Sequence, residues 1–200
     1  MAGVKQFDEQ TVLDKATRVF WEKGFEGTSI QDLVAATGLH RGSLYGAFGD
    51  KEQLFLRGMD HYNEQVAGPL IDALDHVDPR VALARFFGET LARLEDAQLP
   101  PGCLNTNTAT AMPTCPARVQ RALRESVEAM ERALYQMLLR SQRHGYLAAG
   151  EDLQALAHYI ICINHGLAVM NRRGLGAAVL RDVVATALEV VAAKVPNLPF

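Results

Sequence analysis

Residues 28–51 constrain the fold most, because they read as two short helices joined by a tight turn. Ser29 stands at an N-cap position with an acidic residue three places on, and an apolar stripe at helical spacing follows it. Gly38 stands where a left-handed residue would end this helix. A second helix is expected from about residue 40 to 48, with its polar side chains outward. This pattern predicts a helix-turn-helix whose second helix is exposed.

The sequence of residues 37–54 resembles the recognition-helix signature of the TetR/AcrR family of bacterial one-component transcriptional regulators. These residues read Thr-Gly-Leu-His-Arg-Gly-Ser-Leu-Tyr-Gly-Ala-Phe-Gly-Asp-Lys-Glu-Gln-Leu, and the similarity covers roughly residues 8–58. The resemblance implies an all-α fold of about nine helices. A three-helix DNA-binding domain would span residues 1–50, and a helical effector-sensing and dimerisation domain would span residues 51–200.

The same resemblance implies a DNA-binding regulator, most commonly a repressor, and suggests which side chains meet DNA. Arg41 is the expected base contact, because a guanidinium can pair with O6 and N7 of guanine. A solvent-facing arginine is the alternative at that position. Lys51 resembles the phosphate clamp of the family, supported by the N-terminal dipole of its helix. The expected DNA-binding residues are Thr28, Ser29, His40, Arg41, Gly42, Ser43, Tyr45 and Lys51.

The charge of the chain does not favour DNA binding by itself. The formal net charge is −3, and residues 1–60 hold seven Lys/Arg against nine Asp/Glu. Because a few well-placed cations, hydroxyls and helix N-termini are enough to position a protein on phosphates, we give the local pattern more weight. Weak non-specific affinity is the expected consequence.

The remainder of the chain reads as further helices without strand patterns or repeats. Gly58, Gly68 and Pro69 could loosen or end the fourth helix. On the next helix, the residues expected to face inward are Val81, Ala84, Phe87, Leu91 and Leu94. The expected helices span residues 8–23, 51–66, 79–97, a short piece within 99–116, 117–144, 152–173 and 177–195. The last two are apolar nearly all round, which predicts a homodimer formed through helices 152–173 and 177–195.

Cys103 is the main candidate for sensing an effector. It lies in Pro-Pro-Gly-Cys-Leu before a run of Asn and Thr that signals a helix start, and a thiol at a helix N-terminus has a lowered pKa. Cys115 is a candidate resolving partner. A packing role for Cys103 and a reversible small-molecule pocket without any redox role are the alternatives. Candidate polar residues for that pocket are Asn105, Asn107, Thr108 and His165.

Other classes of protein have less support in the sequence. Three cysteines without an export signal predict free thiols and a cytoplasmic protein without a membrane partner. A thiol-dependent hydrolase built on Cys103 and His165 is a remote alternative, because no enzyme motif frames these residues. The histidines and cysteines lack ligand spacing, so we expect neither a metal nor another cofactor.

Overall fold

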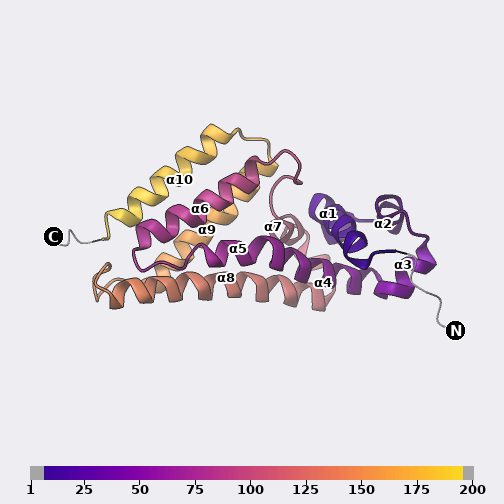
Figure 1. Cartoon of the computed structure of the whole chain (residues 1–200), viewed down its shortest axis with the longest axis horizontal. Coiled ribbons are helices and arrows are strands. Elements are labelled where there is room, and N and C mark those ends of the chain that lie inside the picture. Colours follow the sequence, from indigo (N-terminus) through magenta and orange to yellow (C-terminus); the bar gives the residue numbers. More distant parts are fainter. Residues whose placement is uncertain (1–6, 196–200) are drawn as a thin grey trace. The chain divides into compact units, whose positions relative to one another are not determined.

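The structure, a computed structural model, describes residues 7–195, and these are helical without any strand (Figure 1). The bounds of the first helices are α1 Glu9–Gly27, α2 Ile30–Thr37, α3 Arg41–Phe48, α4 Lys51–Tyr62 and α5 Gly68–Asp72. The bounds of the others are α6 Pro79–Glu95, α7 Leu104–Ala109, α8 Ala117–Arg143, α9 Leu153–Arg172 and α10 Ala177–Ala192. The predicted all-α class is therefore confirmed.

The chain divides into two compact units whose bounds differ from a simple N- and C-terminal split. The first unit contains residues 7–65 and 104–124, and the second contains residues 66–103 and 125–195. The helix-turn-helix thus shares a unit with α4, α7 and the start of α8. The expected domain boundary at residue 50 stays a prediction.

An aromatic cluster forms the core of the first unit. The ring centroids of Phe20 and Phe55 lie 5.1 Å apart and those of Phe25 and Phe55 lie 5.2 Å apart, both edge to face. Each such pair adds about 0.5–1.5 kcal/mol to the stabilisation from burial. Leu33 and Leu44 are fully buried and attach α2 and α3 to this core. The core therefore fixes the orientation of the second helix of the motif.

Local signals define the ends of these helices as the sequence predicts. The hydroxyl of Ser29 accepts the N–H of Asp32 at 3.1 Å, and the Asp32 carboxylate accepts the N–H of Ser29 at 2.8 Å, which completes a capping box. Gly38 ends α2 with φ of 73°. Gly24 interrupts α1 with φ of 70°, a left-handed conformation that glycine adopts readily.

The fourth helix ends at Tyr62, before the predicted end at residue 66, but further helical turns follow it. A π-helical stretch, Asn63–Ala67, follows α4, and α5 begins directly after it. Gly68 and Pro69 lie in the first turn of α5 and do not end the helical path. Proline is tolerated in a first helical turn because the N–H that it lacks has no intrahelical partner there. The helix therefore does not end at these residues, whereas the π-helical stretch directly before them is an irregularity of the kind that the prediction of a loosened helix describes.

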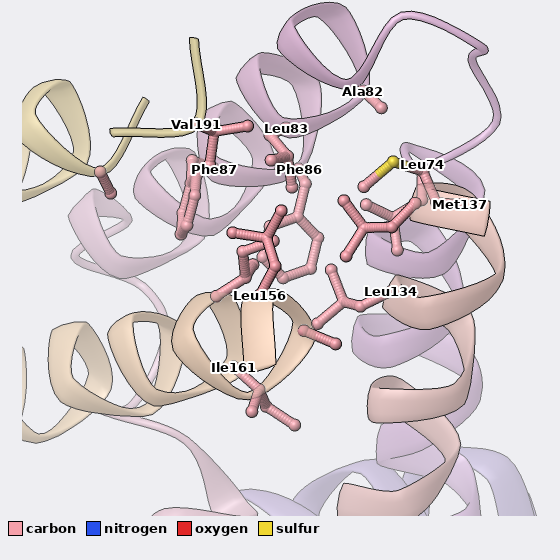
Figure 2. Close-up of a cluster of buried hydrophobic side chains, with 14 of the residues drawn as sticks. Leu74, Ala82, Leu83, Phe86, Phe87, Leu134, Met137, Leu156, Ile161 and Val191 are labelled. Carbon is pink, nitrogen blue, oxygen red and sulfur yellow. The ribbon is translucent and has the colours of Figure 1, made fainter. Parts of the chain in front are cut away.

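Apolar side chains from α6, α8, α9 and α10 form the core of the second unit. Phe86, Phe87, Leu134, Leu156 and Val191 meet in it, all less than a tenth exposed (Figure 2). The inward face of α6 agrees with the expected one only in part. Phe87 and Leu94 are buried as predicted, whereas Ala84 is exposed and Val81 is half-buried. The buried residues of α6 are Pro79, Ala82, Leu83, Phe86, Phe87, Thr90 and Leu94.

By length and composition α9 is apolar enough to cross a membrane. Its Leu156, Ile160 and Leu167 side chains, however, belong to the core of the second unit. A buried core helix has the same composition as a membrane span. The burial of these side chains favours the core role.

Candidate nucleic-acid interface and sensor segment

The second helix of the motif, α3, presents its first turn to solvent. His40, its N-cap residue, and Arg41, Gly42 and Ser43 are exposed, while Leu44 and Phe48 are buried beneath them. The guanidinium carbon of Arg41 lies 5.4 Å from the ring centroid of Tyr45, a cation–π distance. The structure therefore brings four of the expected DNA contacts together on one exposed turn.

Ser29 is exposed at the start of α2, and its hydroxyl already serves the capping box. The Asp32 carboxylate of this box also forms a 2.5 Å ion pair with Lys23. The hydrogen bonds from Lys23 and Ser29 hold the pKa of Asp32 well below its usual range. Ser29 thus remains at the surface, in a conformation fixed by its own cap.

Thr28 does not lie at the surface. Its side chain is 1% exposed, and its hydroxyl donates a 2.6 Å hydrogen bond to the carbonyl of Gly24. This bond closes the turn after the interruption of α1. We therefore remove Thr28 from the expected DNA contacts, because its hydroxyl is used within the fold.

Lys51 opens α4 and is half-buried. Its ammonium nitrogen lies 4.4 Å from the ring centroid of Phe25. Burial lowers the pKa of Lys51, and the nearby Glu26 and Cys115 oppose this shift. Asp50 caps the same helix by accepting the N–H of Gln53 at 2.8 Å. The expected phosphate clamp therefore stands at a helix N-terminus, but its cation rests on an aromatic ring.

Arg57, which the sequence analysis did not single out, contacts the end of the second helix of the motif. It lies in α4, where its guanidinium carbon is 4.7 Å from the ring centroid of Phe48. The same guanidinium donates to the carbonyl of Ala47 and to the carboxylate of Glu9, each at 3.4 Å. A cation at the C-terminal carbonyls of α3 complements the helix dipole. The signal in the sequence is a basic residue six positions after the predicted phosphate clamp.

Cys103 is the residue directly before α7, and it is half-buried. Asn171 of α9 holds the preceding residue, since its side-chain oxygen accepts the N–H of Gly102 at 2.7 Å. The side-chain nitrogen of Asn171 donates to the carbonyl of Leu94 at 2.8 Å. The position of Cys103 is therefore fixed by a helix distant in sequence, and Asn171 had no sequence signal for this role.

Cys115 is buried, and its thiol donates to the carbonyl of Ala111 at 3.4 Å. Burial raises its pKa, Glu26 adds to this effect, and Lys51 opposes it. A raised pKa reduces the thiolate fraction, which opposes the expected resolving role. Cys115 belongs to the first unit, whereas Cys103 belongs to the second.

The polar residues of α7 are used mainly within the first unit. Asn107 is buried, and its amide donates to the carbonyl of Trp21 in α1 at 2.8 Å. Thr108 is 1% exposed. Asn105 and His165 are half-buried, and burial lowers the pKa of His165, which favours its neutral form. The expectation that Asn107 lines a ligand pocket is thereby revised, because its amide attaches α7 to α1. Within residues 7–195, no cluster of three His, Cys, Asp or Glu side chains could hold a metal ion.

A capped helix-turn-helix with an exposed cationic turn, joined to a helical body, defines a helix-turn-helix regulatory protein. Comparison with known families agrees. Residues 12–57 match the family described as bacterial regulatory proteins, tetR family, and residues 79–192 match the tetracyclin repressor-like C-terminal domain. The chain belongs to the TetR family.

Individual relatives are also transcriptional regulators. The chain is 31% identical to the HTH-type transcriptional repressor ComR of Escherichia coli, over 93% of this chain and 90% of ComR. It is 33% identical to the uncharacterized HTH-type regulator YezE of Bacillus subtilis, over 80% of this chain and 84% of YezE. A solved structure of a cysteine mutant of the TetR-family regulator CifR, bound to a 26-base-pair operator, is 32% identical with a TM-score of 0.88. That comparison covers 94% of this chain and 98% of CifR.

Proposed function

We propose that this protein is a cytoplasmic, homodimeric transcriptional repressor that binds a pseudo-palindromic operator and is released by an effector. The observation that carries the proposal is the exposed first turn of α3, in which Arg41 is held over Tyr45 while Leu44 and Phe48 attach the helix to the core. The repressor ComR and the operator-bound CifR mutant support the same function.

In the proposed complex, α3 enters the major groove. Arg41 reads guanine, and His40 and Ser43 contact neighbouring base edges or phosphates. The backbone at Gly42 allows close approach, while Ser29, Tyr45 and Lys51 contact the phosphates and position the helix. A two-fold dimer would place two copies of α3 in successive major grooves, with centres about 34–36 Å apart.

Release of the operator is proposed to begin at Cys103. The chain leaves the second unit directly after this residue and enters the first at Leu104. Asn107 attaches α7 to α1, the helix that precedes the helix-turn-helix. A modification that displaces the start of α7 would therefore also act on α1. A coupling free energy of about 1–3 kcal/mol is typical of such regulation. The proposal includes no disulfide with Cys115, because this thiol is buried and its raised pKa disfavours the thiolate.

A reversible ligand is the second candidate trigger, and one observation favours it. The hydroxyl of Thr108 is buried without a hydrogen-bond partner in the described part of the chain. Buried polar atoms are normally hydrogen-bonded, so such an atom is a natural contact for a small polar molecule. Asn105 and His165 remain proposed contacts of the same kind.

The first test is a titration of the purified protein against DNA from upstream of its own gene, at two salt concentrations. The titration is repeated after treatment with a small disulfide reagent, which forms a mixed disulfide with accessible thiols by thiol–disulfide exchange, and again after reduction of that disulfide. Salt-dependent binding that is lost on treatment and restored by reductant supports the Cys103 trigger. Binding that ignores the reagent leaves the reversible ligand as the trigger, and absence of binding shows that this DNA carries no operator.

Two variants separate recognition from sensing in this experiment. Arg41→Ala should remove the preference for the operator over unrelated DNA, by about 1–3 kcal/mol for a bidentate guanine contact. Cys103→Ser should bind the operator as the wild type does and lose the thiol response. Retained specificity in the first variant, or an unchanged response in the second, contradicts the corresponding part of the proposal.

A further inference from the structure

Three arginines at the start of α8 form a basic surface that the proposed DNA contacts do not include. Arg118, Arg121 and Arg124 are all exposed, and their spacing of three places them on one side of the helix. Residues 104–124 contain no acidic residue. We name Arg118, Arg121 and Arg124 the α8 basic surface.

The α8 basic surface belongs to the same compact unit as the helix-turn-helix. Figure 1 shows the start of α8 beside α4, and one ion pair between the two helices agrees with this placement. The guanidinium of Arg118 lies 3.5 Å from the carboxylate of Glu52, which follows Lys51 in the first turn of α4. The α8 basic surface therefore adjoins the helix N-terminus at which a phosphate contact is proposed.

The Arg118–Glu52 pair holds Arg118 only loosely. The Arg118 side chain is 64% exposed, and exposed pairs contribute only about 0–1 kcal/mol. Arg121 forms no ion pair with any residue between 7 and 195. A phosphate group can therefore replace the carboxylate at Arg118 and can bind Arg121 directly.

Charge balance gives the reason for such a surface. Residues 1–65 hold seven Lys/Arg and ten Asp/Glu, whereas residues 104–124 hold three arginines without an acid. Lys51 is half-buried on Phe25. Residues 1–65 alone carry a net negative charge, which a polyanion repels. The arginines of α8 supply positive charge beside this segment.

We propose that Arg118 and Arg121 bind the DNA phosphate backbone beside the start of α4, as a sequence-independent contact in addition to α3. This inference rests on the DNA binding proposed above and adds a second contact region to it. Phosphate contacts fix register and affinity without reading sequence. The α8 basic surface therefore strengthens binding to every duplex while α3 selects the operator.

The test is a salt titration of the R118Q/R121Q variant on the operator with flanking base pairs and on an unrelated duplex. Each lost phosphate contact lowers the slope of log affinity against log salt by about 0.9. When the salt concentration rises from about 50 to about 200 mM, the affinity of both proteins decreases. The factor of decrease should be roughly twelvefold smaller for the variant than for the wild type. The ratio of operator to unrelated affinity should stay unchanged.

Two further variants control this experiment. R132Q/R143Q removes two exposed arginines of α8 in the second unit and should keep the wild-type slope. R118K/R121K keeps the charge and should restore the slope even where the glutamine variant is less stable. An unchanged slope in R118Q/R121Q, or an equal decrease in R132Q/R143Q, overturns the inference while wild-type operator binding still supports the proposed function. Absence of any wild-type DNA binding overturns the proposed function itself.

Discussion

The ring and the hydroxyl of Tyr45 have different roles in the proposed interface. Its ring supports the guanidinium of Arg41 at 5.4 Å. Its hydroxyl is the proposed phosphate contact. Because the ring and the hydroxyl can be separated by a single-atom change, this residue allows positioning and base reading to be measured apart.

Tyr45→Phe keeps the ring beneath Arg41 and removes only the hydroxyl. We expect affinity to decrease for operator and unrelated DNA alike, by about 0.5–1.5 kcal/mol for one hydrogen bond, with the ratio of the two affinities unchanged. Fluorescence anisotropy titrations on both duplexes measure this. Tyr159→Phe, in the second unit, is the matched control and should bind as the wild type does. A change in the operator preference would show that Tyr45 also reads sequence.

At the scale of single residues, prediction from the sequence fails for side chains that could bind any of several partners. Arg41 and Ser43 were placed on the exposed face correctly, because the helical period of Leu44 and Phe48 fixes that face. Thr28 and Asn107 carry the same chemistry as a phosphate or ligand contact. Their actual partners, Gly24 and Trp21, depend on the turn geometry and on the tertiary packing of α7.

Helix ends were predictable where their signals are local. Ser29, Gly38 and Asp50 act within four residues of themselves, and the structure has them as caps or helix ends. The continuation through Pro69 and the attachment of α7 to α1 depend on packing between distant segments. Local signals in the sequence therefore predict where helices begin and end better than they predict contacts between distant segments.

Two glycines in the first unit distinguish the free-energy cost of placing a side chain at positive φ from ordinary helix propensity. Gly24 has φ of 70°, and a Cβ there would lie 3.3 Å from the carbonyl oxygen of Asn107. Gly46 lies within α3 with open space around its Cβ position. The same substitution should therefore have opposite effects at the two positions.

Gly24→Ala should lower the free energy of unfolding by about 1–3 kcal/mol, because alanine is strained at positive φ and crowds α7. Gly46→Ala should raise it by roughly 0.5–1 kcal/mol, because alanine loses less conformational entropy in a helix. Urea denaturation of DNA-free protein, followed by circular dichroism, measures both. Similar effects at both positions would contradict the special role assigned to Gly24.

At the scale of the whole molecule, exposed apolar side chains gather in the last two helices and the turn between them. Large hydrophobic residues exposed by more than a third in residues 7–195 are Val169, Leu175, Val179 and Val190. Such a concentration marks an interaction surface, and a two-fold dimer can bury it against itself. The apolar patterns of residues 152–173 and 177–195 had indicated the same surface, and its burial in a dimer stays a prediction.

V179D/V190D should convert the proposed dimer into a monomer, because burying two carboxylates in an apolar seam is costly. Both side chains are about 40% exposed within one chain, so the fold of the second unit should persist. Sedimentation velocity measures the mass, and operator titration measures the consequence. Loss of the link between two half-sites should lower operator affinity by about 10²–10⁴-fold, as expected for lost bivalency. A84D, at an exposed position of α6, is the control and should stay dimeric. A variant that remains dimeric with full affinity would place the dimer contact away from Val179 and Val190 of α10.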